Sequence, residues 1–101
     1  MLHIVNKSPF QNKTLESCLR IASKAEGGAL LLVEDGVYAA TKGNSLEGKI
    51  IEAAKNIPIY ALSPDLEARG MQNAVTDGVT LVDYGGFVDL VVEHSSVQSW
   101  L

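Results

Sequence analysis

The sequence predicts an α/β fold: a single small domain, residues 1–101, with a mostly parallel sheet flanked by helices. Short aliphatic and β-branched runs alternate along the chain with segments of helical periodicity. Such alternation requires crossover connections, which join parallel strands and cover the sheet with helices. The 101 residues, 47% of them hydrophobic, suffice for one core and leave nothing for a second.

Four segments are expected to be strands: residues 2–6, 29–33, 57–62 and 79–82. Residues 29–33 are continuously aliphatic and bounded by turn residues, which is typical of a strand buried on both faces. Pro58 falls near the start of the third strand, where a missing amide is tolerated. Ser8-Pro9 is expected to break the first strand.

Helices are expected between these strands. In residues 14–24 the apolar side chains follow the i, i+3, i+4, i+7 spacing of an amphipathic helix, which Gly27 and Gly28 would end. Further helical segments are expected at residues 37–40, after a cap at Ser45, at 65–69 and at 84–93. No strand is expected in the tail, which runs on to Trp100 and Leu101.

The charge distribution argues against nucleic-acid binding. The net charge is −4, which opposes a phosphate-binding surface. The basic residues near the start have Glu16 and Glu26 among them, so a solvated helix face is favoured over a nucleic-acid patch. These basic residues are Lys7, Lys13, Arg20 and Lys24.

No cofactor or metal is expected. No glycine fingerprint or phosphate loop follows a strand, so nucleotide binding is unsupported. His3, His94 and Cys18 are too far apart in the sequence to indicate a metal cluster. We expect His3 to be a satisfied polar side chain in or beside the first strand.

A cytoplasmic location without a membrane partner is expected. The single cysteine allows no internal disulfide and indicates a reducing compartment. The first seven residues lack the layout of a signal peptide, and the longest apolar run, residues 29–33, is too short to span a bilayer.

Ligand sites of open parallel sheets lie beyond the carboxyl ends of the strands, where the loops at residues 6–10, 34–37 and 63–65 should meet. Asp35-Gly36 in one of these loops is either a turn or part of a crevice or partner contact. Trp100 near the chain end indicates docking, either on the domain itself or, as we slightly favour, on a neighbouring subunit.

Cys18 is the candidate catalytic residue, and two interpretations of its role are possible. It shares a face with Leu15 and Leu19, which favours a buried packing residue. Alternatively it carries persulfide sulfur, because a cap at Thr14 would place it near a helix start and Lys13 would add positive potential. The exposure of the Cys18 side chain decides between these two interpretations. We expect partial exposure, near a crevice or subunit junction.

Several segments in series resemble the DsrH/TusB family of sulfur-relay subunits. The opening resembles the family's Met-Leu-His start and Ser-Pro-aromatic turn, and later segments resemble its Asp-Gly, Ala-Ala and Asp-Leu-x-Ala-Arg-Gly elements. These segments are residues 1–10, 31–40, 60–70 and 82–88, with Trp100 at the end. Each is weak alone, and together they span nearly the whole chain.

The resemblance implies a DsrE-like fold and a heterohexamer with DsrE-like and DsrF-like sister subunits. It also implies passage of persulfide sulfur to a small acceptor protein, with the principal sulfur-carrying cysteine on a sister subunit. This chain would then not be an enzyme by itself. Direct contact with nucleic acid is not implied.

The family has two branches, one in sulfur oxidation and a TusB-like one that assists 2-thiolation of the tRNA wobble uridine. The context of Cys18, residues 15–19, and the ending at residues 97–101 resemble the sulfur-oxidation branch more. Sulfur oxidation is therefore the expected pathway. The alternatives are tRNA thiolation and a non-catalytic structural subunit.

Overall fold

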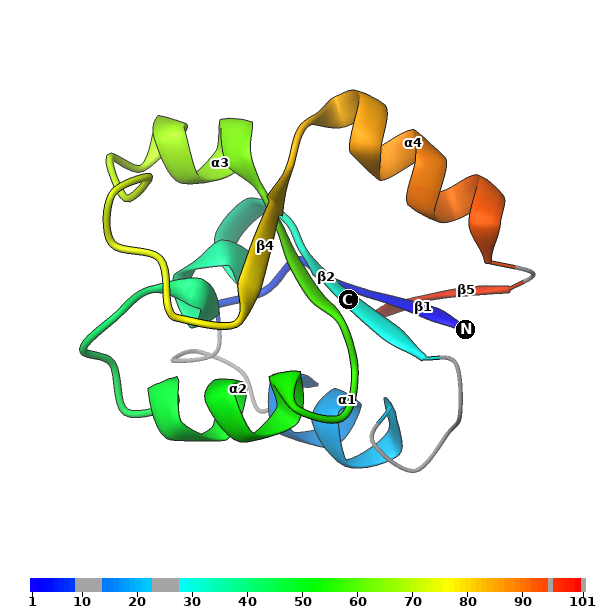
Figure 1. Cartoon of the computed structure of the whole chain (residues 1–101), viewed down its shortest axis with the longest axis horizontal. Coiled ribbons are helices and arrows are strands. Elements are labelled where there is room, and N and C mark those ends of the chain that lie inside the picture. Colours follow the sequence, from blue (N-terminus) through cyan, green and yellow to red (C-terminus); the bar gives the residue numbers. More distant parts are fainter. Residues whose placement is uncertain (9–13, 23–27, 95, 101) are drawn as a thin grey trace.

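Five parallel strands form the centre of the molecule in the order β4-β3-β2-β1-β5 (Figure 1). The structure, a computed structural model, describes residues 1–8, 14–22, 28–94 and 96–100. The strands are β1 (Leu2–Val5), β2 (Ala29–Leu32), β3 (Ile59–Leu62), β4 (Val79–Val82) and β5 (Val97–Trp100). The predicted α/β class with a parallel sheet is confirmed.

Helices cover both faces of this sheet (Figure 1). The helical segments are α1 (Thr14–Ala22), the 3-10 helix η1 (Glu34–Ala40), α2 (Glu47–Ala54), α3 (Ser63–Ala68) and α4 (Tyr84–Glu93). From β1 to β3 the chain advances in one direction, so right-handed crossovers place α1 and α2 on the same face. The connection from β4 to β5 runs in the opposite direction, which places α4 on the other face.

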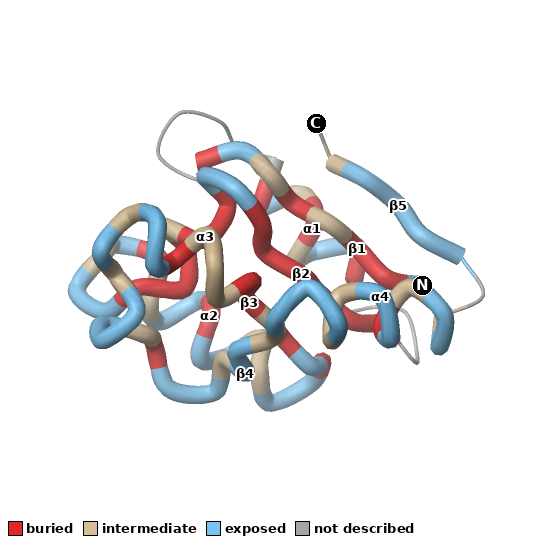
Figure 2. The backbone as a smooth tube through the Cα atoms, turned by 90° about the horizontal axis from the view of Figure 1, so that it is seen from above, coloured by how far each residue is buried: buried red, intermediate tan, exposed pale blue. Residues whose placement is uncertain are grey.

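The sheet separates two unequal apolar clusters. Successive side chains of a strand point to opposite faces, so Leu30 and Leu32 pack toward α1 and α2 while Leu31 packs toward α4. The cluster beneath α1 and α2 is the larger, and α4 contributes a single buried residue, Leu90, to the other. All of β2 is buried, as predicted, whereas β5 and most of α4 are exposed (Figure 2).

The tail differs from the prediction because it forms the edge strand β5. Val97 pairs in register with Leu2, and Trp100 with Val5. The segment Val-Gln-Ser-Trp carries little apolar signal because an edge strand pairs on one side and is largely exposed here. Parallel pairing to the distant β1 leaves no local mark in the sequence.

Smaller differences concern helix starts. The 3-10 helix begins at Glu34 rather than at Val37. Before α2, a cap at Ser45 was expected, but Asn44 is the residue whose side chain accepts a hydrogen bond, from the Leu46 amide (2.7 Å). The predicted last helix, residues 84–93, is confirmed, with Asp83 accepting the Gly86 amide as its cap (2.8 Å). The expected break at Pro9, the stop at Gly27 and the final Leu101 lie outside the described residues.

Candidate functional site

A cavity of about 390 Å³ opens where the carboxyl ends of the strands meet α4. Its wall includes one residue from each loop expected there, Asn6, Glu34 and Asp65. Apolar side chains and the two aromatic residues at the start of α4 complete the lining, together with one serine of β5. These residues are Ile4, Val33, Leu62, Tyr84, Phe87 and Ser99.

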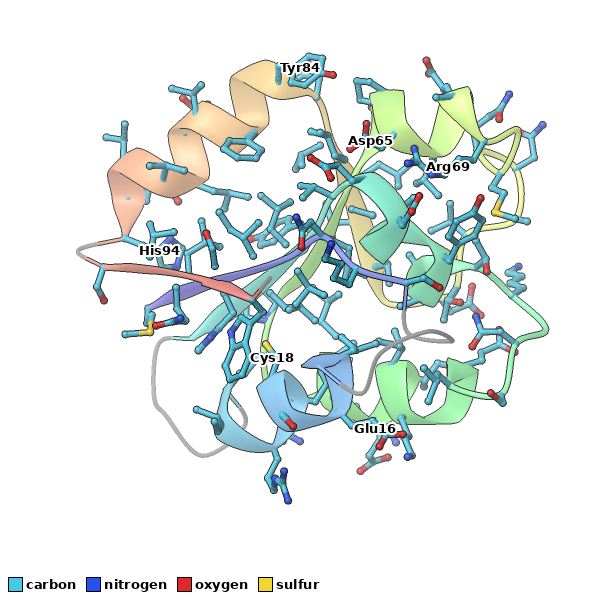
Figure 3. The ribbon with its side chains drawn as sticks, turned by 180° about the vertical axis from the view of Figure 1, so that it is seen from behind. Glu16, Cys18, Asp65, Arg69, Tyr84 and His94 are labelled. Atoms are coloured by element: carbon cyan, nitrogen blue, oxygen red, sulfur yellow. The ribbon has the colours of Figure 1, made fainter. Side chains whose placement is uncertain are left out.

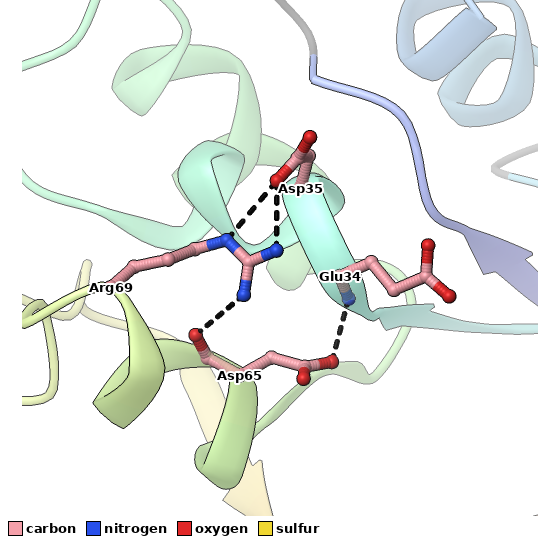
Figure 4. Close-up of polar contacts among 4 residues, drawn as sticks. All are labelled: Glu34, Asp35, Asp65 and Arg69. Atoms are coloured by element: carbon pink, nitrogen blue, oxygen red, sulfur yellow. Dashed lines mark hydrogen bonds and ion pairs between the residues drawn. The ribbon is translucent and has the colours of Figure 1, made fainter.

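The two acidic residues of the cavity wall belong to η1 and α3, which a hydrogen bond joins. The Glu34 amide donates to Asp65 Oδ2 (2.6 Å), which joins the end of β2 to α3 (Figure 4). Glu34 has a φ of 49°, a left-handed conformation that is uncommon for a residue other than glycine. The hydrogen bond to Asp65 therefore stabilises a costly backbone turn at this edge of the sheet.

Asp35 is not part of the cavity lining, and its side chain contacts Arg69 (Figure 4). Its Oδ1 accepts from Arg69 Nη2 (2.8 Å) and Nε (3.2 Å), and Arg69 Nη1 also donates to the Asp65 carbonyl (3.0 Å). The hydrogen bond with Asp35 raises the pKa of Arg69. Arg69 also lies over the Tyr38 ring, 5.8 Å from its centre, so it connects α3 to η1. A contact of Asp35 with a partner chain stays a prediction.

Gly36 has a packing role that the sequence did not reveal. A Cβ atom at this position would lie 2.2 Å from the carbonyl oxygen of Val5. Only glycine therefore lets η1 approach the end of β1 this closely. Of these two neighbours, Asp35 therefore forms a surface ion pair with Arg69, and Gly36 packs against the backbone of Val5.

Cys18 lies on the sheet side of α1 and is fully buried (Figure 3). The prediction of partial exposure near a crevice is wrong for this chain, because Cys18 belongs to the cluster beneath α1 and α2 rather than to the cavity wall. Lys13 and the side chain of Thr14, which were expected to favour the thiolate, lie outside the described residues.

Burial raises the pKa of the Cys18 thiol to about 12. At neutral pH about one molecule in 10⁵ would then carry the thiolate. The thiolate is the form that attacks sulfur and receives it. In this conformation Cys18 is neither accessible nor ionised.

Trp100 docks on its own domain. Its indole Nε1 donates to His3 Nδ1 (3.1 Å), the ring centres are 6.1 Å apart, and the side chain packs against the cluster beneath α1. His3 is buried in β1 and its pKa is lowered by desolvation, so the neutral ring can accept this bond. The prediction of a satisfied His3 is confirmed. Trp100 is only half-buried, so contact with a partner chain stays a prediction.

The sequence analysis did not identify Arg69 and Tyr84 as residues in or beside the cavity at the carboxyl ends of the strands. Tyr84 lies at the start of α4, on the same side of the molecule as Asp65 (Figure 3). The spacing of Asp65 and Arg69, one helical turn apart, was the available signal. Within the described ranges, no three His, Cys, Asp or Glu side chains gather as a metal site would require.

A second hollow, of about 340 Å³, lies between α1 and α2. Its lining mixes both signs of charge, and the ion pair of Glu16 with Lys49 (3.1 Å) spans the two helices. This hollow therefore lacks a consistent charge that would select a ligand. Over the described ranges, every helix is too short or too polar to traverse a bilayer.

The fold is shared with solved structures. The ychN protein from E. coli superposes with a TM-score of 0.83 at 21% identity, covering 97% of both chains. MTH1491 from Methanobacterium thermoautotrophicum, a protein of unknown function, superposes with a TM-score of 0.73 at 21% identity, covering 97% of this chain and 95% of that one. At this identity the likeness shows the fold alone, which defines the class of protein as a small α/β domain with a parallel sheet.

The sequence defines the family within that fold class. Residues 7–97 match the family described as "DsrH like protein". Protein TusB of Pectobacterium parmentieri is 41% identical over 100 residues, covering 99% of this chain and 100% of the relative. Protein TusB of Escherichia coli is 41% identical over 102 residues with the same coverage. The chain belongs to the DsrH/TusB family.

Proposed function

We propose that this chain is a non-catalytic subunit of a cytoplasmic sulfur-relay complex that supports 2-thiolation of the tRNA wobble uridine. The observation that carries the proposal is full-length similarity to relatives named TusB. This similarity favours the thiolation branch over sulfur oxidation, although local features around Cys18 resemble the sulfur-oxidation branch. Contact with tRNA itself is not part of the proposal, because the chain carries a net charge of −4.

Sulfur-transfer chemistry supports the non-catalytic part of the proposal. An attacking thiolate bonds to the terminal sulfur of a donor persulfide, the sulfur–sulfur bond breaks, and the donor leaves as a thiolate. Cys18 is buried and its thiol pKa is raised to about 12, so it meets neither requirement. A cysteine of a sister subunit would then receive the sulfur. A carrier role for Cys18 would require α1 to move off the sheet.

The contribution of this chain is structural in this proposal. It would assemble with DsrE-like and DsrF-like sister subunits into a heterohexamer and shape the surface that a small acceptor protein meets. Asp35 and Trp100 stay candidate contacts for these partners, although both already make contacts within the chain. The incompletely covered α4 side of the sheet is consistent with association.

The test is genetic complementation with tRNA analysis. A host lacking its corresponding gene should lose 2-thiouridine at the wobble position, and this chain should restore it. The variants Cys18→Ala and Cys18→Ser should restore it equally, provided that both are folded. If loss of the gene leaves thiolation intact, the chain belongs to another pathway.

A second measurement addresses the residue rather than the pathway. The assembled complex is loaded with a persulfide donor, and the intact mass of each subunit is determined. We expect no added sulfur on this chain and added sulfur on a sister subunit. Sulfur bound here and lost in Cys18→Ala would overturn the non-catalytic assignment.

A further inference from the structure

The helix α4 carries more apolar surface than the sheet can cover. At 100° per residue, Phe87 and Leu90 face the sheet, whereas Tyr84, Val88 and Val92 form a second row beside them. The residues of this second row are 62%, 58% and 78% exposed, respectively. A surface helix normally confines its apolar residues to the side that packs on the core.

The acidic residues of α4 are placed where they destabilise the helix. Asp89 and Glu93 lie one turn apart, where like charges repel, and Glu93 sits in the last turn, where the helix dipole favours cations. Within the described part of the chain, no lysine or arginine lies on α4 or lines the adjoining cavity. A cationic surface brought against α4 would relieve both unfavourable terms.

We propose that the α4 surface, formed by Tyr84, Val88, Val92, Asp89 and Glu93, docks a different protein chain whose contact face is apolar at its centre and carries lysine or arginine beside it. The inference rests on the proposed function, since it assumes that the chain works within a complex. The apolar row supplies the buried centre, and the acidic pair supplies the polar rim.

The adjoining cavity fits the same partner chemistry. Tyr84 belongs both to the α4 surface and to the cavity wall, in which Glu34 and Asp65 are the acidic residues. The buried Asn6 Oδ1 accepts no hydrogen bond from any described residue. The aliphatic stem of a lysine or arginine could lie against Leu62 and Phe87, with its charged end at the carboxylates.

A second copy of this chain fits the α4 surface poorly. A symmetric pair would place the same surface on both sides and so bring acidic residues together without any cation between them. An anionic membrane surface is disfavoured for the same reason. The occupant is therefore a different, locally basic protein.

The test measures binding of this chain to its purified sister subunits by isothermal titration calorimetry. Val88→Glu places a charge in the centre of the apolar row and should weaken binding at least about tenfold. Ile21→Glu is the matched control, because Ile21 is an exposed apolar residue (51%) on α1 at the opposite face. It should bind within about twofold of the wild type. Circular dichroism and the urea midpoint establish that both variants are folded.

A charge reversal separates the rim from the centre. Asp89→Lys should weaken binding severalfold, whereas Glu52→Lys on the exposed side of α2 should not. Equal binding by Val88→Glu and the wild type would overturn the inference and leave the proposed function standing. Failure of the wild type to bind the sister subunits overturns both. Self-association in sedimentation that Val88→Glu abolishes would assign the α4 surface to a second copy and overturn the inference.

Discussion

The side of the sheet under α1 and α2 and the side under α4 differ in how completely they are covered. Beneath α1 and α2, Leu15, Cys18 and Ile50 are buried in one continuous cluster with the strands. Beneath α4, a smaller cluster is only partly shielded by Phe87 and Val91, and the outer row of α4 is apolar and exposed. The first side has the packing of a finished core, and the second has that of an incomplete one.

This difference explains where function is expected. A closed side stabilises the fold and hides the single cysteine, so that side cannot perform thiol chemistry in this conformation. An open side leaves apolar area that is best buried by association. Cys18 therefore lies on the side that stabilises the fold, and the α4 side is the one available for recognition of a partner protein.

The largest effect is expected at the junction of η1 with β1. Gly36→Ala would place a Cβ 2.2 Å from a backbone oxygen, so η1 must move, and we expect a loss of about 3–4 kcal/mol in the free energy of unfolding. Gly48→Ala in α2 is the control, since nothing lies within 4 Å of its added Cβ. That variant should be neutral or up to about 1 kcal/mol more stable. Urea unfolding measures both, and a mild effect at Gly36 would show that η1 is not held closely against β1.

The next effect compares one apolar residue from each side of the sheet. Leu15→Ala removes a buried side chain from α1 and should cost about 3 kcal/mol. Val88→Ala removes an exposed one from α4 and should change the stability of the isolated chain by no more than about 0.5 kcal/mol. Similar losses in urea unfolding would mean that the two sides are equally packed. In the assembled complex, Val88→Ala should become costly as well.

The sequence predicted the closed side well because its signal is local and periodic. The spacing of Leu15, Cys18 and Leu19 places one face of α1 inward, and the unbroken apolar run of β2 indicates burial on both faces. The three segments at the carboxyl ends were predicted to meet, and they do, because parallel strands must end at the same edge of the sheet. Residues 34–37 and 63–65 are helical rather than loops, since they open η1 and α3.

Three features could not be predicted from the sequence because they depend on residues distant in the chain. The strand β5 exists through pairing with β1, more than ninety residues earlier in the chain. The exposure of Cys18 depended on how tightly α1 packs on the sheet, which the helix pattern alone does not define. Gly36 was similarly recognised as a turn residue, whereas its contact is with the carbonyl of Val5.

A third effect follows from the titration of Cys18. Its thiol pKa is raised in the folded state, so the unfolded chain loses this proton first as the pH rises above about 9. The free energy of unfolding should then fall progressively as the pH rises from about 9 toward 12. Cys18→Ala should lack this contribution, so the difference between the two chains isolates it from other titrations. Identical slopes would mean that the thiol is solvated in the native state.

The smallest effect is expected at the pairing of Trp100 with His3, on the edge of the closed side. Trp100→Phe removes the indole donor and should cost about 1 kcal/mol, because the buried His3 Nδ1 loses its partner. The pKa of His3 is lowered by desolvation, so its contribution to stability is present above pH 6.5 and is lost as the pH falls below that value. Protonation at Nδ1 would also remove the acceptor for the indole. Urea unfolding at pH 8 and at successively lower pH should show a difference between Trp100→Phe and the wild type that shrinks once the pH falls below the folded-state pKa of His3. A difference that stays the same over the whole range would mean that Trp100 stabilises the edge strand through packing alone.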